Sequence, residues 1–228
     1  MTADLNNTGL ELSYEALDST TYGPTRTARS RIGGLSDVTL NEQGLWQAGA
    51  DTIDPTAFAG LKGLQPVTNS PDGLESSVAY FYQARQFSYQ LFGEVGQILP
   101  FQLTAQAAKG AGTAGVGEVR GRVLKTKANV SATGATGTAY ELGATSSSQH
   151  LYAIFHVFSV GTTITAVVES DSDNTFASAT TRITFGPITT TGGTWGTRVA
   201  GAITDTWYRV RVTAITGTFS IACAAGIK

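Results

Sequence analysis

The chain has 228 residues, of which 14% are charged, 27 are glycine and 34 are threonine. The charged fraction lies well below the roughly 25% of ordinary soluble domains, and so much glycine and threonine disfavours a helix-rich fold. Fifteen Lys and Arg against 17 Asp and Glu give a formal net charge of -2, which excludes the basic footprint of a nucleic-acid-binding protein. A single cysteine excludes an internal disulfide, and two histidines leave little for a structural zinc site.

The sequence contains neither of the two common membrane signals. No basic segment followed by an apolar one opens the chain, so we expect no secretory signal. The most continuous apolar stretch, residues 151–160, is about ten residues long, whereas a helix that crosses a bilayer needs about 20. We therefore expect a chain that is made in the cytoplasm and is not inserted into a membrane.

The amino-terminal part predicts a strand followed by a long loop. Leu10, Leu12, Tyr14 and Ala16 alternate with polar residues, which is the period of a half-buried strand. Residues 18–34 contain almost nothing apolar to bury, so we expect an extended loop there. Structureless loops of this length are uncommon in compact domains and are usually either functional or disordered.

Three arginines in this segment are the candidate contact residues of the chain. Arg26, Arg29 and Arg31 have few acidic neighbours in sequence, and guanidinium groups suit contact with an acidic surface on a partner. We expect them to form inter-subunit contacts. The alternative is a solvated flexible loop with no partner.

The next segments continue the β pattern with one interruption. Asp54 and Pro55 form a helix start signal, and Phe58 and Leu61 would share one face of a short helix. A glycine-rich turn over residues 110–117 precedes a strand rather than a helix, so it lacks the context of a dinucleotide-binding loop. Alternation or aromatic density predicts strands over residues 35–46, 78–89, 98–107 and 118–127.

A segment rich in Ala, Ser, Thr and Gly, residues 128–148, is the best place for a domain boundary. We expect one β domain over residues 1–130, a sandwich or barrel with one short flanking helix. A second β-sandwich of jelly-roll or immunoglobulin-like type is expected over residues 131–228, with Cys223 as a small hydrophobic residue in its core. Its predicted strands are residues 151–160, 164–169, 182–185, 207–214 and 219–227.

A search for catalytic or metal-binding patterns yields little. His150 and His156 are too far apart along a strand to share one metal ion, and His156 is better explained as a hydrogen-bonded core residue. Residues 171–174 start like a calcium loop but lack its later ligands, and Asp and Asn also favour ordinary turns. We expect no enzyme and no cofactor, although a glycosidase with two dispersed carboxylates is an alternative.

Two tryptophans are candidate ligand-contact residues. Trp195 lies in a segment rich in Gly and Thr, and Trp207 lies beside alternating arginines. Either could stack on a sugar ring or on a partner, because tryptophan is favoured where one edge stays wet. Packing in the core or at a strand end is the competing explanation.

One run of the sequence carries a resemblance to a known family. Residues 29–46 read RSRIGGLSDVTLNEQGLW, an arginine-rich segment followed by the pattern G-L-x-D-x-x-L-x-x-x-G-x-W, and a short helix is predicted next. The segments RQFSY at residues 85–89 and LPFQLTAQ at residues 99–106 continue the match, which covers residues 10–127. This part resembles the tail tube, or major tail, proteins of long-tailed noncontractile bacteriophages. Residues 140–228 look like the C-terminal extension of some of these proteins.

The resemblance implies a structural virion protein of the phage tail that is assembled in the host cytoplasm. Such a protein forms hexameric rings that stack into a hollow tube around a tape-measure protein, contacts tail-end or connector proteins, and later conducts double-stranded DNA. Neutral polar strand faces and a small net charge fit a surface that passes DNA without binding it. The alternative is a capsid-decorating or carbohydrate-binding β-sandwich.

Overall fold

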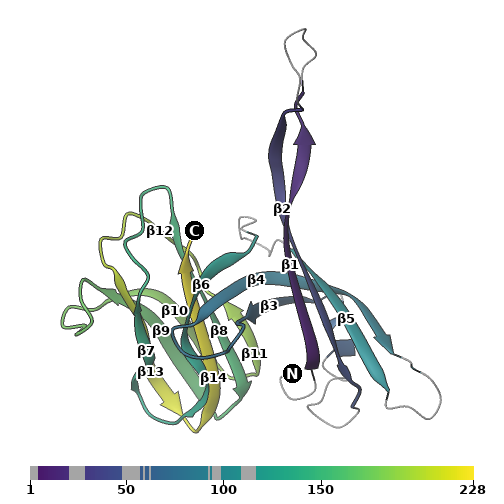
Figure 1. Cartoon of the computed structure of the whole chain (residues 1–228). Coiled ribbons are helices and arrows are strands. Elements are labelled where there is room, and N and C mark those ends of the chain that lie inside the picture. The colour runs from purple at the N-terminus through teal and green to yellow at the C-terminus, as the bar shows by residue number, and fades with distance from the viewer. Residues whose placement is uncertain are drawn as a thin grey trace. The chain divides into compact units, whose positions relative to one another are not determined.

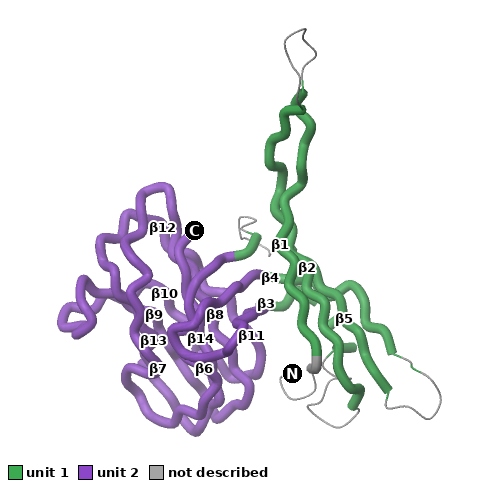
Figure 2. Tube along the Cα trace, in the orientation of Figure 1, with its two compact units in different colours: residues 1–65, 83–118 green, residues 66–82, 119–228 purple. Residues whose placement is uncertain are grey.

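The computed structural model describes residues 5–20, 29–47, 57–58, 60–61, 63–91, 93, 99–108 and 117–228. Most of them lie in antiparallel strands, so the prediction of a mainly β fold is confirmed. The chain forms two compact units, which Figure 2 distinguishes by colour. Unit 1 comprises residues 1–65 and 83–118, and unit 2 comprises residues 66–82 and 119–228.

Unit 1 is built on an antiparallel sheet in the order β1-β2-β5-β4. Its strands are β1 (Leu5–Asp18), β2 (Arg31–Leu45), β5 (Pro100–Ala107) and the later residues of β4 (Val78–Leu91). One face of the sheet is apolar and buried, because Leu40, Leu103 and Ala105 are almost fully covered. The strict alternation of β5 produces this burial, as the sequence predicts.

A short helical segment covers part of this apolar face. Ala57, Phe58 and Gly60 are helical, in agreement with the predicted helix. The expectation that Phe58 and Leu61 provide its buried face is wrong, because Phe58 is 70% exposed and Leu61 is half-buried. The buried positions are Ala57 and Gly60; a Cβ atom at Gly60 would lie 2.9 Å from the side-chain oxygen of Gln86, so only glycine fits there without a shift. There the side-chain amide of Gln86 donates a hydrogen bond of 2.8 Å to the carbonyl of Ala57.

Unit 2 is a β-sandwich of two antiparallel sheets. The first sheet runs β6 (Val119–Val130), β14 (Phe219–Ile227), β8 (His150–Ser159) and β11 (Gly192–Trp195), with β12 (Val199–Ala200) also on β8. The second runs β10 (Thr180–Ile188), β9 (Thr163–Asp171), β13 (Trp207–Thr216) and β7 (Gly134–Glu141). Both sheets contribute inward residues to a single core, and Phe155 of β8 stacks on Phe185 of β10 with ring centroids 5.3 Å apart. Cys223 lies in this core as predicted.

The units divide the chain differently from the boundary expected at residue 130. Strand β6 belongs to the sandwich because it pairs with β14 along its length. Residues Val78–Phe81 of β4 also pair with β6, while Ala84–Leu91 pair with β5 of unit 1. β3 (Leu64–Asn69) pairs with β4.

In the turn before β4, the Glu75 carboxylate accepts hydrogen bonds from Lys125, Thr126 and Thr138.

The prediction of a loop over residues 18–34 is wrong for residues 31–34. β1 continues to Asp18 and β2 begins at Arg31, so residues 31–34 are strand rather than loop. The two strands pair as far as Asp18 and Arg31, and the N–H of Ser19 donates to the carbonyl of Ser30 just beyond. Backbone hydrogen bonding across the hairpin therefore extends the strands through a segment that has few apolar residues to bury.

Candidate functional site

The end of the β1–β2 hairpin forms a ribbon of two strands, which we define as Leu12–Asp18 of β1 and Arg31–Val38 of β2. β2 pairs with β5 only from Thr39 onward, whereas its pairing with β1 continues to Arg31. Figure 1 shows the two strands continuing beyond the end of β5. Isolated two-stranded hairpins are at best marginally stable in water. The ribbon therefore lacks the support that the rest of the sheet provides.

The ribbon exposes an unusual amount of apolar surface. Val38 at its base is fully buried, but its other large apolar side chains are exposed: Leu12, Tyr14, Leu17, Ile32 and Leu35, with exposed fractions of 42, 62, 41, 57 and 82%. The strand predicted from Leu10, Leu12, Tyr14 and Ala16 is therefore confirmed, but the expected half-burial of one face holds only at Leu10. The alternation is present, but the described residues cover little of the ribbon beyond Val38, and the Tyr14 hydroxyl donates a hydrogen bond of 3.3 Å to Glu118. A β-bulge between Tyr14 and Ala16 also shifts the register there.

Charged groups are distributed unevenly along the hairpin. Arg29 and Arg31 lie at its far end and are exposed, and neither forms an ion pair with another described residue. Arg26 lies outside the described residues. Nearby, hydrogen bonds from the side chain and backbone of Thr20 lower the pKa of Asp18. The remaining acidic groups, Glu11, Glu15, Asp37 and Glu42, lie further down the two strands.

The face of the unit 1 sheet opposite its core is polar and almost uncharged. The strand registers align its residues in three rows across β1, β2, β5 and β4. The first row consists of four amide side chains: Asn7, Gln43, Gln102 and Gln90. The second row is Gly9, Asn41, Thr104 and Ser88. The third row, Glu11, Thr39, Gln106 and Arg85, contains the two charged residues. We call these twelve residues the amide face. Within it, the Thr104 hydroxyl donates to the Asn41 side-chain oxygen at 3.0 Å.

A shallow hollow lies at one end of the amide face. It has a volume of about 330 Å³, and its lining includes the three glutamines of the first row together with Phe101 and Pro100. Each glutamine offers one acceptor and two donors, so the hollow presents a neutral hydrogen-bonding surface. The described residues that line it include no acidic or basic side chain.

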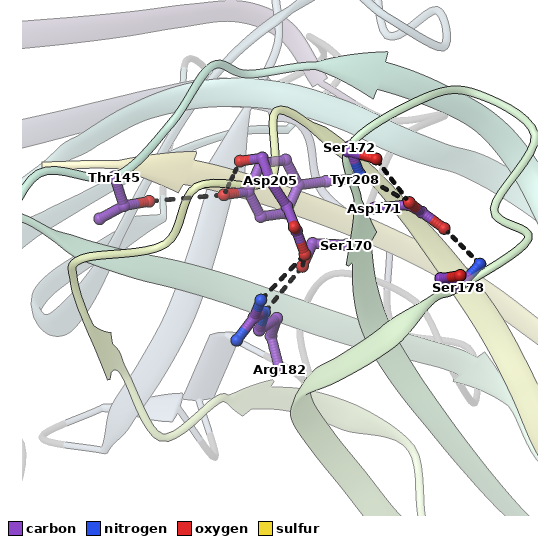
Figure 3. Close-up of polar contacts among 8 residues, drawn as sticks. All are labelled: Thr145, Ser170, Asp171, Ser172, Ser178, Arg182, Asp205 and Tyr208. Atoms are coloured by element: carbon purple, nitrogen blue, oxygen red, sulfur yellow. Dashed lines mark hydrogen bonds and ion pairs between the residues drawn. The ribbon is translucent and has the colours of Figure 1, made fainter.

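Unit 2 contains a polar network that joins β9 and β10 to Asp205, which precedes β13 (Figure 3). The Arg182 guanidinium donates to the hydroxyl of Ser170 at 2.7 Å and to the Asp205 carboxylate at 2.9 Å, and Ser170 also donates to Asp205 at 2.6 Å. The Ser170 hydrogen bond, followed by the Arg182 contact, lowers the pKa of Asp205. The buried hydroxyl of Tyr208 donates to the backbone carbonyl of Asp205. These groups satisfy one another, so the network is a structural one.

A second charged cluster lies on the other face of β9 and β13. Glu169 is almost fully buried, accepts a hydrogen bond of 2.5 Å from Arg209 and lies 3.8 Å from Arg211. The Arg209 guanidinium also covers the ring of Phe176 at 4.1 Å from its centroid. The cluster ties the turn that carries Phe176 to the sheet.

The two candidate tryptophans occupy different environments. Trp195 is half-buried, with its ring 5.6 Å from that of Phe81 and 6.3 Å from that of Tyr152, and its indole N–H is buried without a hydrogen-bond acceptor among the described residues. Trp207 is half-buried at the first position of β13, opposite Glu141 and Asp171. Trp195 therefore packs in an aromatic cluster. This arrangement corresponds to the packing alternative, and not to the ligand contact, that the sequence left open.

The remaining candidates have structural surroundings. The ring of His156 lies 2.9 Å from the hydroxyl of Thr68, and burial lowers its pKa to about 4, so it is a neutral, hydrogen-bonded residue as predicted. Asp173 accepts hydrogen bonds from the N–H and hydroxyl of Thr175, and Asp171 accepts from the N–H of Ser178, which are contacts of a turn. His150 and His156 lie six residues apart on β8.

Two wider observations apply to the described residues only. They include no group of three or more His, Cys, Asp or Glu side chains placed to hold a metal ion. No helix among them has the length and apolar character needed to cross a bilayer.

The sequence alone did not identify the exposed ribbon or the full extent of the amide face. Alternation predicts β1 but says nothing of what covers it, and the glutamines of three strands align only through the register. A signal for the ribbon is nevertheless present, because β1 contains no lysine, arginine or proline. These are the residues with which proteins commonly protect an edge strand.

Comparisons with known proteins give structural likenesses at low sequence identity. No protein-family model matches the chain, and no curated protein matches it. The chain is similar to a protein in the "virion of native gene transfer agent (GTA) particle", with 18% identity over 47% of this chain and 82% of that one and a TM-score of 0.38. A protein in the "tail of empty GTA particle computed with helical refinement, C6 symmetry" gives 16% identity, coverage of 47% and 80%, and a TM-score of 0.35.

A third likeness extends over nearly the whole chain. The crystal structure of the SPP1 Dit (gp 19.1) protein, described as a hub adsorption apparatus in phages that infect Gram-positive bacteria, shares 11% identity. It covers 98% of this chain and 93% of that one, with a TM-score of 0.35. All three TM-scores lie below 0.4, so these likenesses do not establish a function for this chain.

Proposed function

We propose that the chain is a non-enzymatic structural protein of a phage tail, whose copies form stacked, hexameric rings that make the tail tube. The tube would enclose a tape-measure protein, join tail-end or connector proteins and later conduct double-stranded DNA. The observation that carries the proposal is the ribbon. Its five exposed apolar side chains and two unsupported strands indicate a surface that is completed by another copy of the chain.

Hydrophobic burial supplies the driving force for this assembly. Fully burying a large apolar side chain stabilises by about 1.5–3 kcal/mol, so five half-exposed side chains represent several kcal/mol for each subunit contact. Strand alternation and register place Leu12 and Tyr14 on one face of the ribbon and Leu17, with its partner Ile32, on the other, so both faces present apolar side chains that a neighbouring copy can cover. A ribbon that reaches a different patch on the next copy makes a head-to-tail contact, which can propagate into rings or a tube.

The open edge of β1 supplies a second means of association. Among the described residues β1 pairs only with β2, so the backbone N–H and C=O groups of its outer edge have no partner strand over Leu5–Asp18. The edge carries a β-bulge and the acidic residues Glu11, Glu15 and Asp18 but no lysine, arginine or proline, and its unpaired backbone groups are a template for strand addition. In the proposed ring a strand of the neighbouring copy occupies it.

The arginines at the far end of the hairpin direct the contact. Arg29 and Arg31 are exposed and form no ion pair with another described residue, so they are available to carboxylates of a neighbouring subunit. The sequence assigns Arg26 to the same role. Replacing Arg29 and Arg31 with glutamate should raise the lowest concentration at which assembly occurs by about tenfold, which corresponds to about 1.4 kcal/mol.

Electron microscopy and light scattering of the purified, concentrated chain test the proposal. The unaltered chain should give hollow tubes or uniform rings, and the double variant Ile32→Ser/Leu35→Ser should remain a monodisperse subunit at the same concentration. Leu74→Ser is the matched control, because Leu74 is also a well-exposed leucine but lies in a turn of unit 2, outside the ribbon. A monomeric unaltered chain, or normal tubes from the ribbon variant, would contradict the proposal.

A further inference from the structure

We infer that the arginine end of one copy's ribbon docks on an acidic face of a neighbouring copy's hairpin. The arginine end carries Arg29 and Arg31, and we call Glu11, Glu15 and Asp37 together the acidic face. The inference rests on the proposed function and names the partner surface that the ribbon contacts. It starts from the opposite charges of these two parts of the β1–β2 hairpin.

The three carboxylates of the acidic face lie on one side of the hairpin. Glu11, Ser13 and Glu15 alternate along β1 and share a face, and the register places Asp37 opposite Ser13. Each carboxylate lies two residues along the hairpin from the next, or about 7 Å. This spacing is within the screening length of about 8 Å at physiological ionic strength, so the three charges repel one another.

All three carboxylates are accessible to a partner. Each residue is exposed, and none forms an ion pair with another described residue. A Cβ atom at Gly34 would lie 3.2 Å from a carboxylate oxygen of Glu15, so the missing side chain of Gly34 leaves this carboxylate uncovered. One oxygen of Asp37 accepts a hydrogen bond of 2.8 Å from the N–H of Val38, and its second oxygen can accept another.

The unit 1 sheet does little to neutralise this face. The basic residue in the register row of Glu11 is Arg85, which lies on β4, three strands away from β1. Three strand spacings correspond to about 14 Å, which exceeds the screening length. A cation from outside the subunit would therefore relieve a repulsion that the subunit itself leaves in place.

The arginine end can supply that cation to a neighbouring copy. Arg31 lies opposite Asp18 in the register, and from there Glu15 and Glu11 lie three and seven residues back along β1, or about 10 and 23 Å. Exposed charges at such distances within one hairpin are largely screened. A neighbouring hairpin displaced along the strand by about this length brings its guanidinium groups beside the carboxylates, where they can form bidentate hydrogen bonds.

The same charges disfavour a two-fold pairing of β1 edges. An antiparallel pair of β1 strands centred on Ser13 would place Glu11 of each copy opposite Glu15 of the other. Like charges directly opposite one another destabilise a strand pair. A two-fold contact also closes on itself, whereas contact between the arginine end and the acidic face is head-to-tail and continues from copy to copy.

Charge reversal in a mutant cycle tests the inference. Light scattering and electron microscopy give the lowest concentration at which tubes form. The end variant Arg29→Glu/Arg31→Glu and the face variant Glu11→Lys/Glu15→Lys should each raise this concentration about tenfold, because each places like charges in contact. The quadruple variant should return to within about threefold of the unaltered chain, because it exchanges the charges and restores the pairs.

Mixing the two variants gives a second readout. An equimolar mixture of the end variant and the face variant should form tubes at a concentration where neither does alone. The intact arginine end of the face variant meets the intact carboxylates of the end variant, and the glutamates of the end variant meet the introduced lysines. Altered folding of either copy would not produce this complementation.

A matched control separates a local contact from an effect of net charge. The end variant lowers the formal charge by four, and Glu141→Lys/Thr180→Lys/Thr181→Lys restores it at exposed positions of unit 2. The end variant that carries these three further substitutions should remain impaired about tenfold. Recovery as complete as that of the quadruple variant would overturn the inference.

The remaining outcomes distinguish the inference from the proposed function. If the unaltered chain forms tubes but the quadruple variant is impaired about a hundredfold, the two effects are independent. That result would overturn the inference and leave the proposed tube intact, as would a mixture that assembles no better than its components. If the unaltered chain forms no tubes, the proposed function fails and the inference fails with it.

Discussion

The ribbon and the sandwich of unit 2 contain the same sequence pattern with opposite outcomes. In β13 and β14 alternation places Tyr208, Val210 and Ile221 in a core where they are fully covered. In the ribbon the same alternation leaves Tyr14 and Leu35 largely exposed. The difference is the second layer, because the sandwich has two sheets facing one another, whereas most of the ribbon's large apolar side chains have no full cover among the described residues. An alternating segment thus indicates a face to be buried, and the burying surface can belong to another molecule.

The sandwich core should be the most sensitive part of the chain. Phe155→Ala removes a fully buried ring that stacks on Phe185, and we expect the free energy of unfolding to fall by about 3–5 kcal/mol. Urea denaturation followed by tryptophan fluorescence measures this loss. A change below about 1 kcal/mol would show that Phe155 contributes no more than an exposed residue.

Removing the buried charge of Glu169 should cause the second largest loss of stability. In Glu169→Gln the guanidinium of Arg209 loses its carboxylate partner at a site that is almost closed to solvent, so we expect a loss of about 1–3 kcal/mol. The same denaturation experiment applies. Glu141→Gln, at an exposed position of β7, is the control and should change stability by less than about 0.5 kcal/mol.

Protonation of His156 should make the stability of unit 2 depend on pH. Burial holds the folded pKa at about 4, below the ordinary value of 6.5, so the unfolded chain binds more protons between these values. Stability should therefore fall as pH decreases from about 6.5 to about 4, by roughly 1–3 kcal/mol. His156→Gln retains a partner for Thr68 without titrating and should remove this slope.

Unfolding measured between pH 4 and 7 on both chains gives the required difference. Burial raises the pKa of Glu42 in unit 1, which favours the folded state at low pH and so has the opposite sign. That contribution is common to both chains and cancels in the comparison. Parallel pH profiles for the unaltered chain and His156→Gln would refute the assignment.

The ribbon should be the least sensitive region in the isolated subunit. Because Ile32 and Leu35 are already exposed, Ile32→Ser/Leu35→Ser should change the free energy of unfolding of the monomer by less than about 1 kcal/mol. This small loss sharpens the contrast with Phe155→Ala, since the same variant is expected to abolish assembly. A loss of several kcal/mol in the monomer would show that the ribbon is packed within its own subunit.

The sequence predicted local structure well and the extent of burial poorly. The alternation of residues 98–107 and 207–214 identified β5 and β13, and the apolar run at residues 151–160 identified β8 as a core strand. The helix start at Asp54 predicted helical residues at Ala57 and Phe58, but the buried face differed because Gln86 allows only small residues to approach closely. The end of the loop at Arg31 was missed because cross-strand hydrogen bonds, and not side-chain hydrophobicity, extend β2.

By itself the sequence determined that this protein is built from β-strands, that its surface is poor in charge and that Cys223 is a core residue. These properties follow from local periodicity and composition, which act over a few residues. Only the tertiary structure decided that β6 joins the C-terminal sandwich and that the glutamines of three strands form one row. It also decided that most large apolar side chains of the ribbon are exposed. All three features depend on which distant strands pair with one another. They also depend on the register of that pairing, because a shift of one residue exchanges the two faces of a strand.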